Sequence, residues 1–187
     1  MFTPPEYLSP SAIRTFQDCP QKFKFGRFDN IKEPPTWHTH VGNFVHEVLE
    51  HLYQLPHEER NVEALRTLAA NMWAANDWEN RVTSLAEPLG STKDFKVTAF
   101  KNMTNLWNLE DPAETDLDDM EMTVEAEVEG VRMKGIIDRV AINDEQFAVI
   151  SDYKTGKIPN PKFDSEDKTF FQLLAYALML ESSDGVP

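Results

Sequence analysis

Three polar residues stand in two apolar segments where packing alone does not explain them. Asp138 lies in GIIDRV, and Asp152 and Lys154 lie in VISDYKTG. Two carboxylates from paired strands, with a backbone carbonyl such as that of Tyr153, form the oxygen-rich shell that Mg²⁺ or Mn²⁺ prefers. A lysine ammonium beside them can position a water nucleophile or neutralise charge on a phosphoryl oxygen. Together these groups are the minimum set needed to hydrolyse a phosphodiester.

The segment that carries these residues is predicted to be an antiparallel meander. Apolar and polar residues alternate from 120 to 129, which is typical of a half-buried strand. Glu129-Gly130 predicts a tight turn, and a second strand is expected from Val131 to Ile142. After a turn at Asn143-Asp144, a third strand is expected from Phe147 to Lys154.

This meander would bring the three polar residues together. Because side chains alternate along a strand, Asp152 and Lys154 are expected to share one face. Neighbouring strands lie about 4.8 Å apart, so Asp138 could reach the same cation. The alternative is ordinary cross-strand salt bridges, in which Asp138 pairs with Arg139 or Arg132 and Asp152 pairs with Lys154. The D-x-K spacing by itself favours that alternative.

Two predicted helices add polar pairs spaced by one turn. His46 and Glu50 share one side of the helix that contains GNFVHEVLE, and Gln172 and Tyr176 do so in FQLLAYA. A lone helix histidine is more often structural than a ligand, and a Gln/Tyr pair is more often a buried hydrogen-bonded pair. The presence of both pairs beside the D-x-K spacing strengthens the interpretation as a functional site.

The first part of the chain is predicted to be largely helical. Ser9 before Pro10 is a good helix cap, and the helix that begins there is interrupted near Pro20. Apolar residues at three- and four-residue steps predict further helices, and an apolar helix follows the loop after Lys154. The predicted spans are about Trp37–Gln54, Val62–Trp78, Lys93–Trp107 and Phe170–Leu180.

Five segments in this order, LSPSAIRTFQDCPQKFKF, GNFVHEVLE, GIIDRV, DYKTG and FQLLAYA, resemble the PD-(D/E)XK nuclease superfamily. They are most similar to its RecB-like exonuclease branch, which includes AddB-type and CRISPR-associated RecB-like nucleases. The resemblance implies an α/β fold: a restriction-endonuclease-like core with a three-stranded antiparallel meander flanked by helices, plus an N-terminal helical portion partly covering a DNA channel. We expect one domain over residues 1–187, mainly helical over 1–115, with the nuclease core over 116–187.

The resemblance also implies a metal-dependent DNA nuclease that hydrolyses phosphodiester bonds in DNA replication, recombination or repair. His46, Asp138 and Asp152, with the backbone carbonyl of Tyr153, would hold Mg²⁺ or Mn²⁺, and Lys154 would be the catalytic lysine. An exonuclease is favoured, although the sequence leaves endonuclease activity, polarity and strandedness open. The alternative is a catalytically silent nuclease-like domain that binds DNA or a partner.

Further site residues follow from the same resemblance. Gln172 and Tyr176 would serve DNA binding and active-site order, and Glu125 is a candidate for an outer role. Members with a four-cysteine iron-sulphur cluster carry one cysteine in a context like DCPQKF and three beyond the Gln/Tyr helix. Here only Cys19 is present. One alternative is that Cys19 is a small buried residue. The other is that a longer chain holds the remaining cluster ligands, which the strand-like ending GVP slightly favours. No iron-sulphur cluster is expected in this chain, because one thiolate cannot hold one.

The composition limits the partners and the compartment. With 18 basic and 32 acidic residues, the net charge of −14 opposes general affinity for nucleic acid, although ten of the acids lie between residues 110 and 129. The sequence contains no membrane-length apolar stretch and no signal peptide, and it has a single cysteine. A soluble cytoplasmic protein is expected, with DNA ends or single strands as ligand and a helicase or recombination protein as a possible partner.

Overall fold

A computed structural model of the chain describes residues 5–156 and 166–183. They fall into two compact units. The sheet unit comprises the described residues of Met1–Glu33, Leu117–Asp152 and Lys157–Pro187, and the helical unit comprises Pro34–Asp116 and Tyr153–Gly156. Within the described residues, none of the helices has the length and apolar character needed to cross a membrane.

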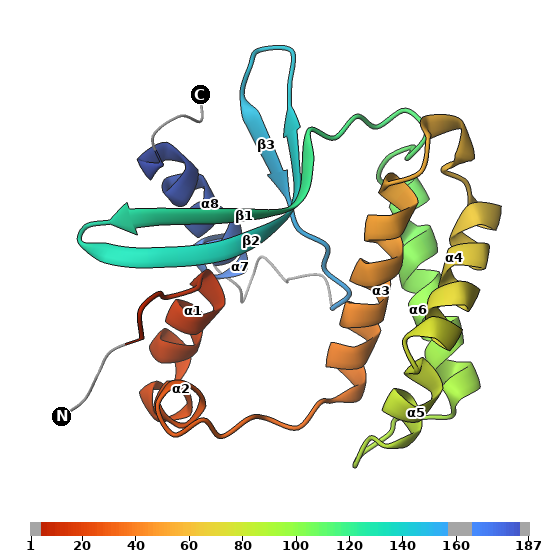
Figure 1. Cartoon of the computed structure of the whole chain (residues 1–187), viewed down its shortest axis with the longest axis horizontal. Coiled ribbons are helices and arrows are strands. Elements are labelled where there is room, and N and C mark those ends of the chain that lie inside the picture. Colours follow the sequence, from red (N-terminus) through yellow and green to blue (C-terminus); the bar gives the residue numbers. More distant parts are fainter. Residues whose placement is uncertain (1–4, 157–165, 184–187) are drawn as a thin grey trace. The chain divides into compact units, whose positions relative to one another are not determined.

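Each unit has its own set of elements (Figure 1). The sheet unit contains α1 (Pro10–Asp18), α2 (Pro20–Arg27), β1 (Asp119–Val128), β2 (Val131–Ile142), β3 (Ala148–Ser151), α7 (Glu166–Thr169) and α8 (Phe171–Ser182). The helical unit contains α3 (Trp37–Tyr53), η1 (His57–Glu59), α4 (Val62–Ala75), α5 (Trp78–Thr83), α6 (Thr92–Thr104) and η2 (Asn105–Asn108).

The sheet is an antiparallel meander in the order β1-β2-β3. Its first turn is made by Glu129 and Gly130, which both have positive φ, as a tight hairpin turn requires. At the second turn, the Asn143 side chain accepts hydrogen bonds from the backbone N–H groups of Glu145 and Phe147. The predicted α/β fold with a three-stranded meander flanked by helices is therefore confirmed.

The core of the sheet unit forms where α8 packs on the sheet, because the apolar side chains of β1 and β2 alternate toward that helix. Ile137 and Met179 are essentially fully buried at its centre. Leu8 adds a short parallel bridge to β2, with backbone hydrogen bonds of 3.0 Å to Arg132 and 3.1 Å to Lys134. The N-terminal segment is thereby tied to the strand that carries Asp138.

The helical unit is built around α3, against which α4 and α6 pack. Thr36 caps α3 by accepting a hydrogen bond from the Thr39 N–H in a capping box. The predicted helix over 62–78 is divided, because Asp77 has a left-handed φ of 54° and α5 begins after it. The turn directs the Trp78 ring into an aromatic core with Phe44 and Phe95.

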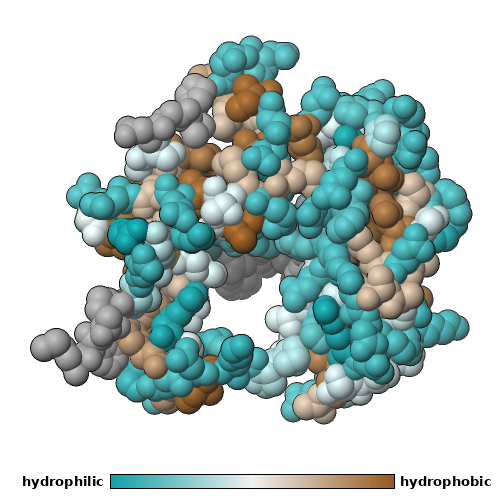
Figure 2. Space-filling model, viewed as in Figure 1, coloured by the Kyte–Doolittle hydropathy of each residue, from teal (hydrophilic) through white to brown (hydrophobic). Residues whose placement is uncertain are grey.

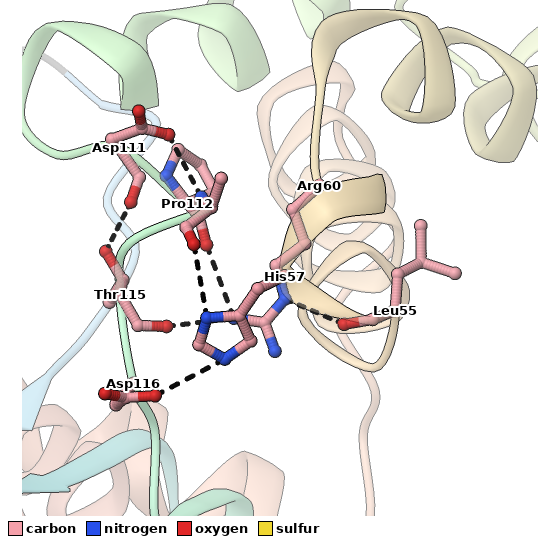
Figure 3. A network of polar contacts seen from close by, with 8 residues as sticks. Leu55, His57, Arg60, Asp111, Pro112, Thr115 and Asp116 are labelled. Atoms are coloured by element: carbon pink, nitrogen blue, oxygen red, sulfur yellow. Dashed lines mark hydrogen bonds and ion pairs between the residues drawn. The ribbon is translucent and has the colours of Figure 1, made fainter.

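A buried arginine joins the start of α4 to the segment before β1 (Figure 3). Arg60 donates hydrogen bonds to the carbonyl oxygens of Leu55 at 2.8 Å, Thr115 at 2.9 Å and Pro112 at 3.3 Å. Beside it, His57 lies 3.3 Å from the Asp116 carboxylate. This network holds the segment 112–116 against the chain between α3 and α4 within the helical unit.

One sequence prediction about elements needs correction. The third strand ends at Ser151 and does not continue to Lys154, because ladder pairing with β2 stops at Arg139–Ser151. Within residues 1–115, the helices α1 and α2 group with the sheet. The single-domain boundaries stay a prediction, and part of the loop predicted between Lys154 and α8, along with the GVP ending, lies outside the described residues.

Candidate active site

Asp138 and Asp152 occupy neighbouring positions of the sheet unit. The pairing of β2 with β3 places Val140 opposite Ile150 and Arg139 opposite Ser151. Continuing this antiparallel register by one residue puts Asp138 opposite Asp152. Asp152 lies one residue past the last ladder pair, so the two aspartates stand next to each other where the pairing of β2 with β3 ends. Their joint role in a site stays a prediction.

The backbone on the other side of Asp138 is irregular. Met120 pairs with Arg139 and Met122 pairs with Ile137, so Glu121 stands opposite Asp138. Glu121 has a φ of 49°, in the left-handed region that non-glycine residues rarely adopt inside a strand. The regular ladder is interrupted beside the carboxylate pair, which no sequence pattern indicated.

Tyr176 lies within electrostatic reach of both carboxylates. Burial raises the pKa of its hydroxyl, hydrogen bonds with Gln172 and the Ile136 backbone lower it, and the charges of Asp152 and Asp138 raise it further. The Gln172 side-chain amide donates to the hydroxyl at 3.3 Å. The Gln/Tyr pair is thus hydrogen-bonded, as its structural interpretation requires, and its role in DNA binding and active-site order stays a prediction.

Gly135 makes room for the Tyr176 ring against β2. A Cβ atom at position 135 would lie 2.5 Å from Cε1 of Tyr176 and 3.4 Å from Cδ of Pro10. The ring is 5% exposed and packed in the core, so it could not simply swing aside. Gly135 belongs to the GIIDRV segment, but its role depends on a helix more than 35 residues later in the sequence.

His46 and the Tyr153 backbone are brought together inside the helical unit. The Nε2 atom of His46 lies 2.8 Å from the Tyr153 carbonyl oxygen, a hydrogen bond in which the imidazole N–H donates. Gly42, one turn earlier on α3, leaves space for Thr155, because a Cβ there would lie 3.4 Å from the threonine hydroxyl. The GNFVH segment therefore presents one face of α3 to the chain after Asp152.

Lys154 is placed differently from the prediction. It is exposed and lies three residues beyond the end of β3, in the part of the chain that belongs to the helical unit. Strand alternation therefore does not apply to Asp152 and Lys154, and their expected position on one face stays a prediction. Their roles stay predictions from the D-x-K motif.

Glu125 and Cys19 do not join this group. Glu125 forms an exposed cross-strand pair with Lys134 at 2.6 Å, and that hydrogen bond lowers the pKa of the Glu125 carboxyl. Asp138 lies four positions after Lys134 in β2, a span of about 13 Å along a strand. Cys19 is exposed, not buried, and caps α2 through a contact of 3.4 Å between its Sγ and the Lys22 N–H.

A family model matches most of the chain. It describes the PD-(D/E)XK nuclease superfamily and matches residues 7–187. The chain belongs to the PD-(D/E)XK nuclease superfamily. No curated protein is significantly similar to the chain. Membership in the PD-(D/E)XK superfamily implies nuclease activity in general, and nucleases of this superfamily use divalent metals, typically Mg²⁺.

The residues fit such a cation in the way that Mg²⁺ requires. Among the described residues, no cluster of three or more His, Cys, Asp or Glu side chains could hold a metal alone. Mg²⁺ in nucleases typically needs only one or two carboxylates, with water and substrate oxygens completing the shell, and the Asp138–Asp152 pair meets this requirement.

Proposed function

We propose that this PD-(D/E)XK protein is a Mg²⁺- or Mn²⁺-dependent deoxyribonuclease of the RecB-like branch. It would act as an exonuclease on DNA ends or single strands, in the cytoplasm, during replication, recombination or repair. The observation that carries the proposal is that the pairing of β2 with β3 ends beside Asp138 and Asp152, whose charges both act on Tyr176, on a chain that matches the superfamily over nearly its whole length.

The proposal assigns a role to each residue of the site. Asp138, Asp152, His46 and the Tyr153 carbonyl would hold the cation. A bound divalent cation supplies Lewis-acid stabilisation of phosphoryl charge and lowers the pKa of the attacking water.

The remaining residues act on the substrate. The Lys154 ammonium orients the attacking water or neutralises charge on the phosphoryl oxygen. The Tyr176 hydroxyl stays protonated at neutral pH, because its pKa is raised above 10.0, and it can therefore donate a hydrogen bond near the carboxylates. Gln172 holds that hydroxyl and would contribute to DNA binding.

A cleavage assay tests the proposal. Single- and double-stranded DNA labelled at the 5′ or 3′ end, and RNA of the same sequence, are incubated with the protein in Mg²⁺ or Mn²⁺. We expect stepwise shortening of DNA by the parent and a loss of at least about 100-fold in Asp152→Ala and Lys154→Ala, as removal of one transition-state contact costs. Glu127→Gln, an exposed carboxylate on β1, should cleave like the parent.

Three outcomes would contradict parts of the proposal. Cleavage that persists in the Asp152 variant or in excess chelator would show that the assigned site is wrong. Equal cleavage of RNA would contradict the specificity for DNA. Cuts within the DNA strand would show an endonuclease and not an exonuclease. A folded parent without activity on any substrate would leave the silent DNA- or partner-binding domain as the function.

A further inference from the structure

An apolar groove runs between two helices of the helical unit. The groove encloses about 740 Å³, with walls from α4 and α6 and a floor that includes Phe44 of α3. Ala69 and Ala70 give the α4 wall a low profile, and Val97 on the α6 wall is 61% exposed. Figure 2 shows hydrophobic surface on the helical unit beside hydrophilic surface. An apolar groove of this kind is energetically unfavourable when it faces water alone.

The charge around the groove is opposite to that of the whole chain. Acidic residues outnumber basic ones by 32 to 18 in the sequence. Among the described residues, however, every charged side chain that lines the groove is basic: Arg66, Lys96 and Lys101. The salt bridges of Arg66 with Glu63 and of Lys96 with Glu79 are exposed, so an incoming anion can replace either acid at little cost.

We propose that this groove binds an amphipathic α-helix of a partner protein, with apolar residues in the groove and acidic residues against its basic rim. The low wall of Ala69 and Ala70 permits close approach of a helix backbone. A further helix lying between α4 and α6 would complete a four-helix arrangement around apolar side chains. Because α4 has 14 residues and α6 has 13, a partner helix of about 20 Å, or three to four turns, would fill it.

The same groove is poorly suited to single-stranded nucleic acid. Bases stack on the free faces of aromatic rings, but Lys96 lies 4.1 Å from the centroid of the Trp73 ring and Arg66 lies 5.4 Å from that of Phe100. The faces that bases would use are therefore already covered by cations. The partner-helix proposal does not depend on the nuclease activity.

A designed peptide provides the probe. It has 16 residues, with leucines at i, i+3, i+4 and i+7 spacing, glutamates flanking that stripe and alanines elsewhere. A matched peptide carries lysine at every glutamate position. Fluorescence anisotropy with the full chain should give a Kd below about 100 µM for the glutamate peptide and a value at least tenfold weaker for the lysine peptide.

Variants locate the binding. Val97→Glu and Lys101→Glu should each weaken binding of the glutamate peptide at least tenfold, whereas Leu89→Glu should not change it. Leu89 is a matched control because it is 65% exposed in the same unit and lies outside the groove. Circular dichroism checks that each variant is folded.

The proposal is overturned if the glutamate peptide does not bind, if both peptides bind equally, or if folded Val97→Glu binds like the parent. Displacement of the peptide by a 16-nucleotide oligo-dT would also overturn it, and would assign the groove to nucleic acid.

Discussion

At the scale of single residues, Asp152 is the side chain whose replacement separates electrostatics from packing. Asp152→Asn keeps the size of the side chain but removes its charge and one metal ligand of the proposed site. It should therefore abolish the stabilisation that excess Mg²⁺ or Mn²⁺ gives the parent. Urea unfolding with and without metal measures this effect.

Glu127→Gln is the control for Asp152→Asn, because this exposed carboxylate lies on β1 opposite Arg132 and not opposite another acid. It should keep the full metal-dependent stabilisation. If Asp152→Asn is stabilised by metal as strongly as the parent, the carboxylate pair is not the cation site.

Gly135 offers a second test at the residue scale. Gly135→Ala places a methyl group 2.5 Å from the Tyr176 ring, and overpacking of this kind costs about 1 to 3 kcal/mol. We expect this loss in urea unfolding, with a larger fractional loss of cleavage because the tyrosine hydroxyl moves away from Asp138 and Asp152. Gly26→Ala is the control, since nothing lies within 4 Å of a Cβ there. Parent-like stability of Gly135→Ala would contradict the close packing.

At the scale of elements, the contact of α3 with α5 makes stability sensitive to pH. The pKa of His40 is lowered from 6.5, first by burial, with the nearby Arg81 charge acting the same way and a hydrogen bond with the Arg81 backbone acting against them. The unfolded chain therefore takes up this proton more readily than the folded chain. The His40 contribution is complete above about pH 6.5 and is lost as the pH falls through the lower folded pKa.

The measurement is urea unfolding of the parent and His40→Gln at several values between pH 8 and pH 5. The stability of the parent should fall more steeply than that of the variant below about pH 6.5. Parallel curves would show that another group causes the loss.

The Arg60 network is a second element-scale contact, between the start of α4 and the segment 112–116. Arg60→Ala leaves the Leu55, Pro112 and Thr115 carbonyls without their donor and should cost about 2 to 3 kcal/mol of unfolding free energy. Arg66→Ala is the matched control, because Arg66 is exposed and its pair with Glu63 contributes little. Equal effects of the two substitutions in urea unfolding would contradict the importance of the buried network.

At the scale of the whole molecule, the net charge of −14 predicts how DNA binds. Non-specific binding depends on phosphate neutralisation by basic residues, which this chain has in deficit. Binding of a single-stranded oligonucleotide to the cleavage-defective Lys154→Ala should therefore be weak in chelator and tighten at least about tenfold in Mg²⁺ at constant ionic strength. Fluorescence anisotropy measures it. Tight binding in chelator that weakens steeply with salt would contradict this dependence on the cation.

Much of the fold is determined locally and could be predicted from the sequence. Hydrophobic periodicity and turn residues predicted β2 at its observed bounds, Val131–Ile142, and α3 to within one residue at its end. These signals act between neighbours in the chain, so they need no knowledge of distant contacts. The motif order likewise predicted the superfamily, which the match over residues 7–187 shows.

Only the tertiary structure determines how the strands pair and which helices group with the sheet. Three features depend on contacts between distant segments: the pairing of β2 with β3 beside Asp138, the end of β3 at Ser151, and the space that Gly135 leaves for Tyr176. So does the grouping of α1 and α2 with the sheet. Alternation indicates which faces of a strand are apolar, but pairing depends on the partner strand. For this reason the D-x-K motif was visible in the sequence, whereas the placement of Lys154 beyond the strand was not.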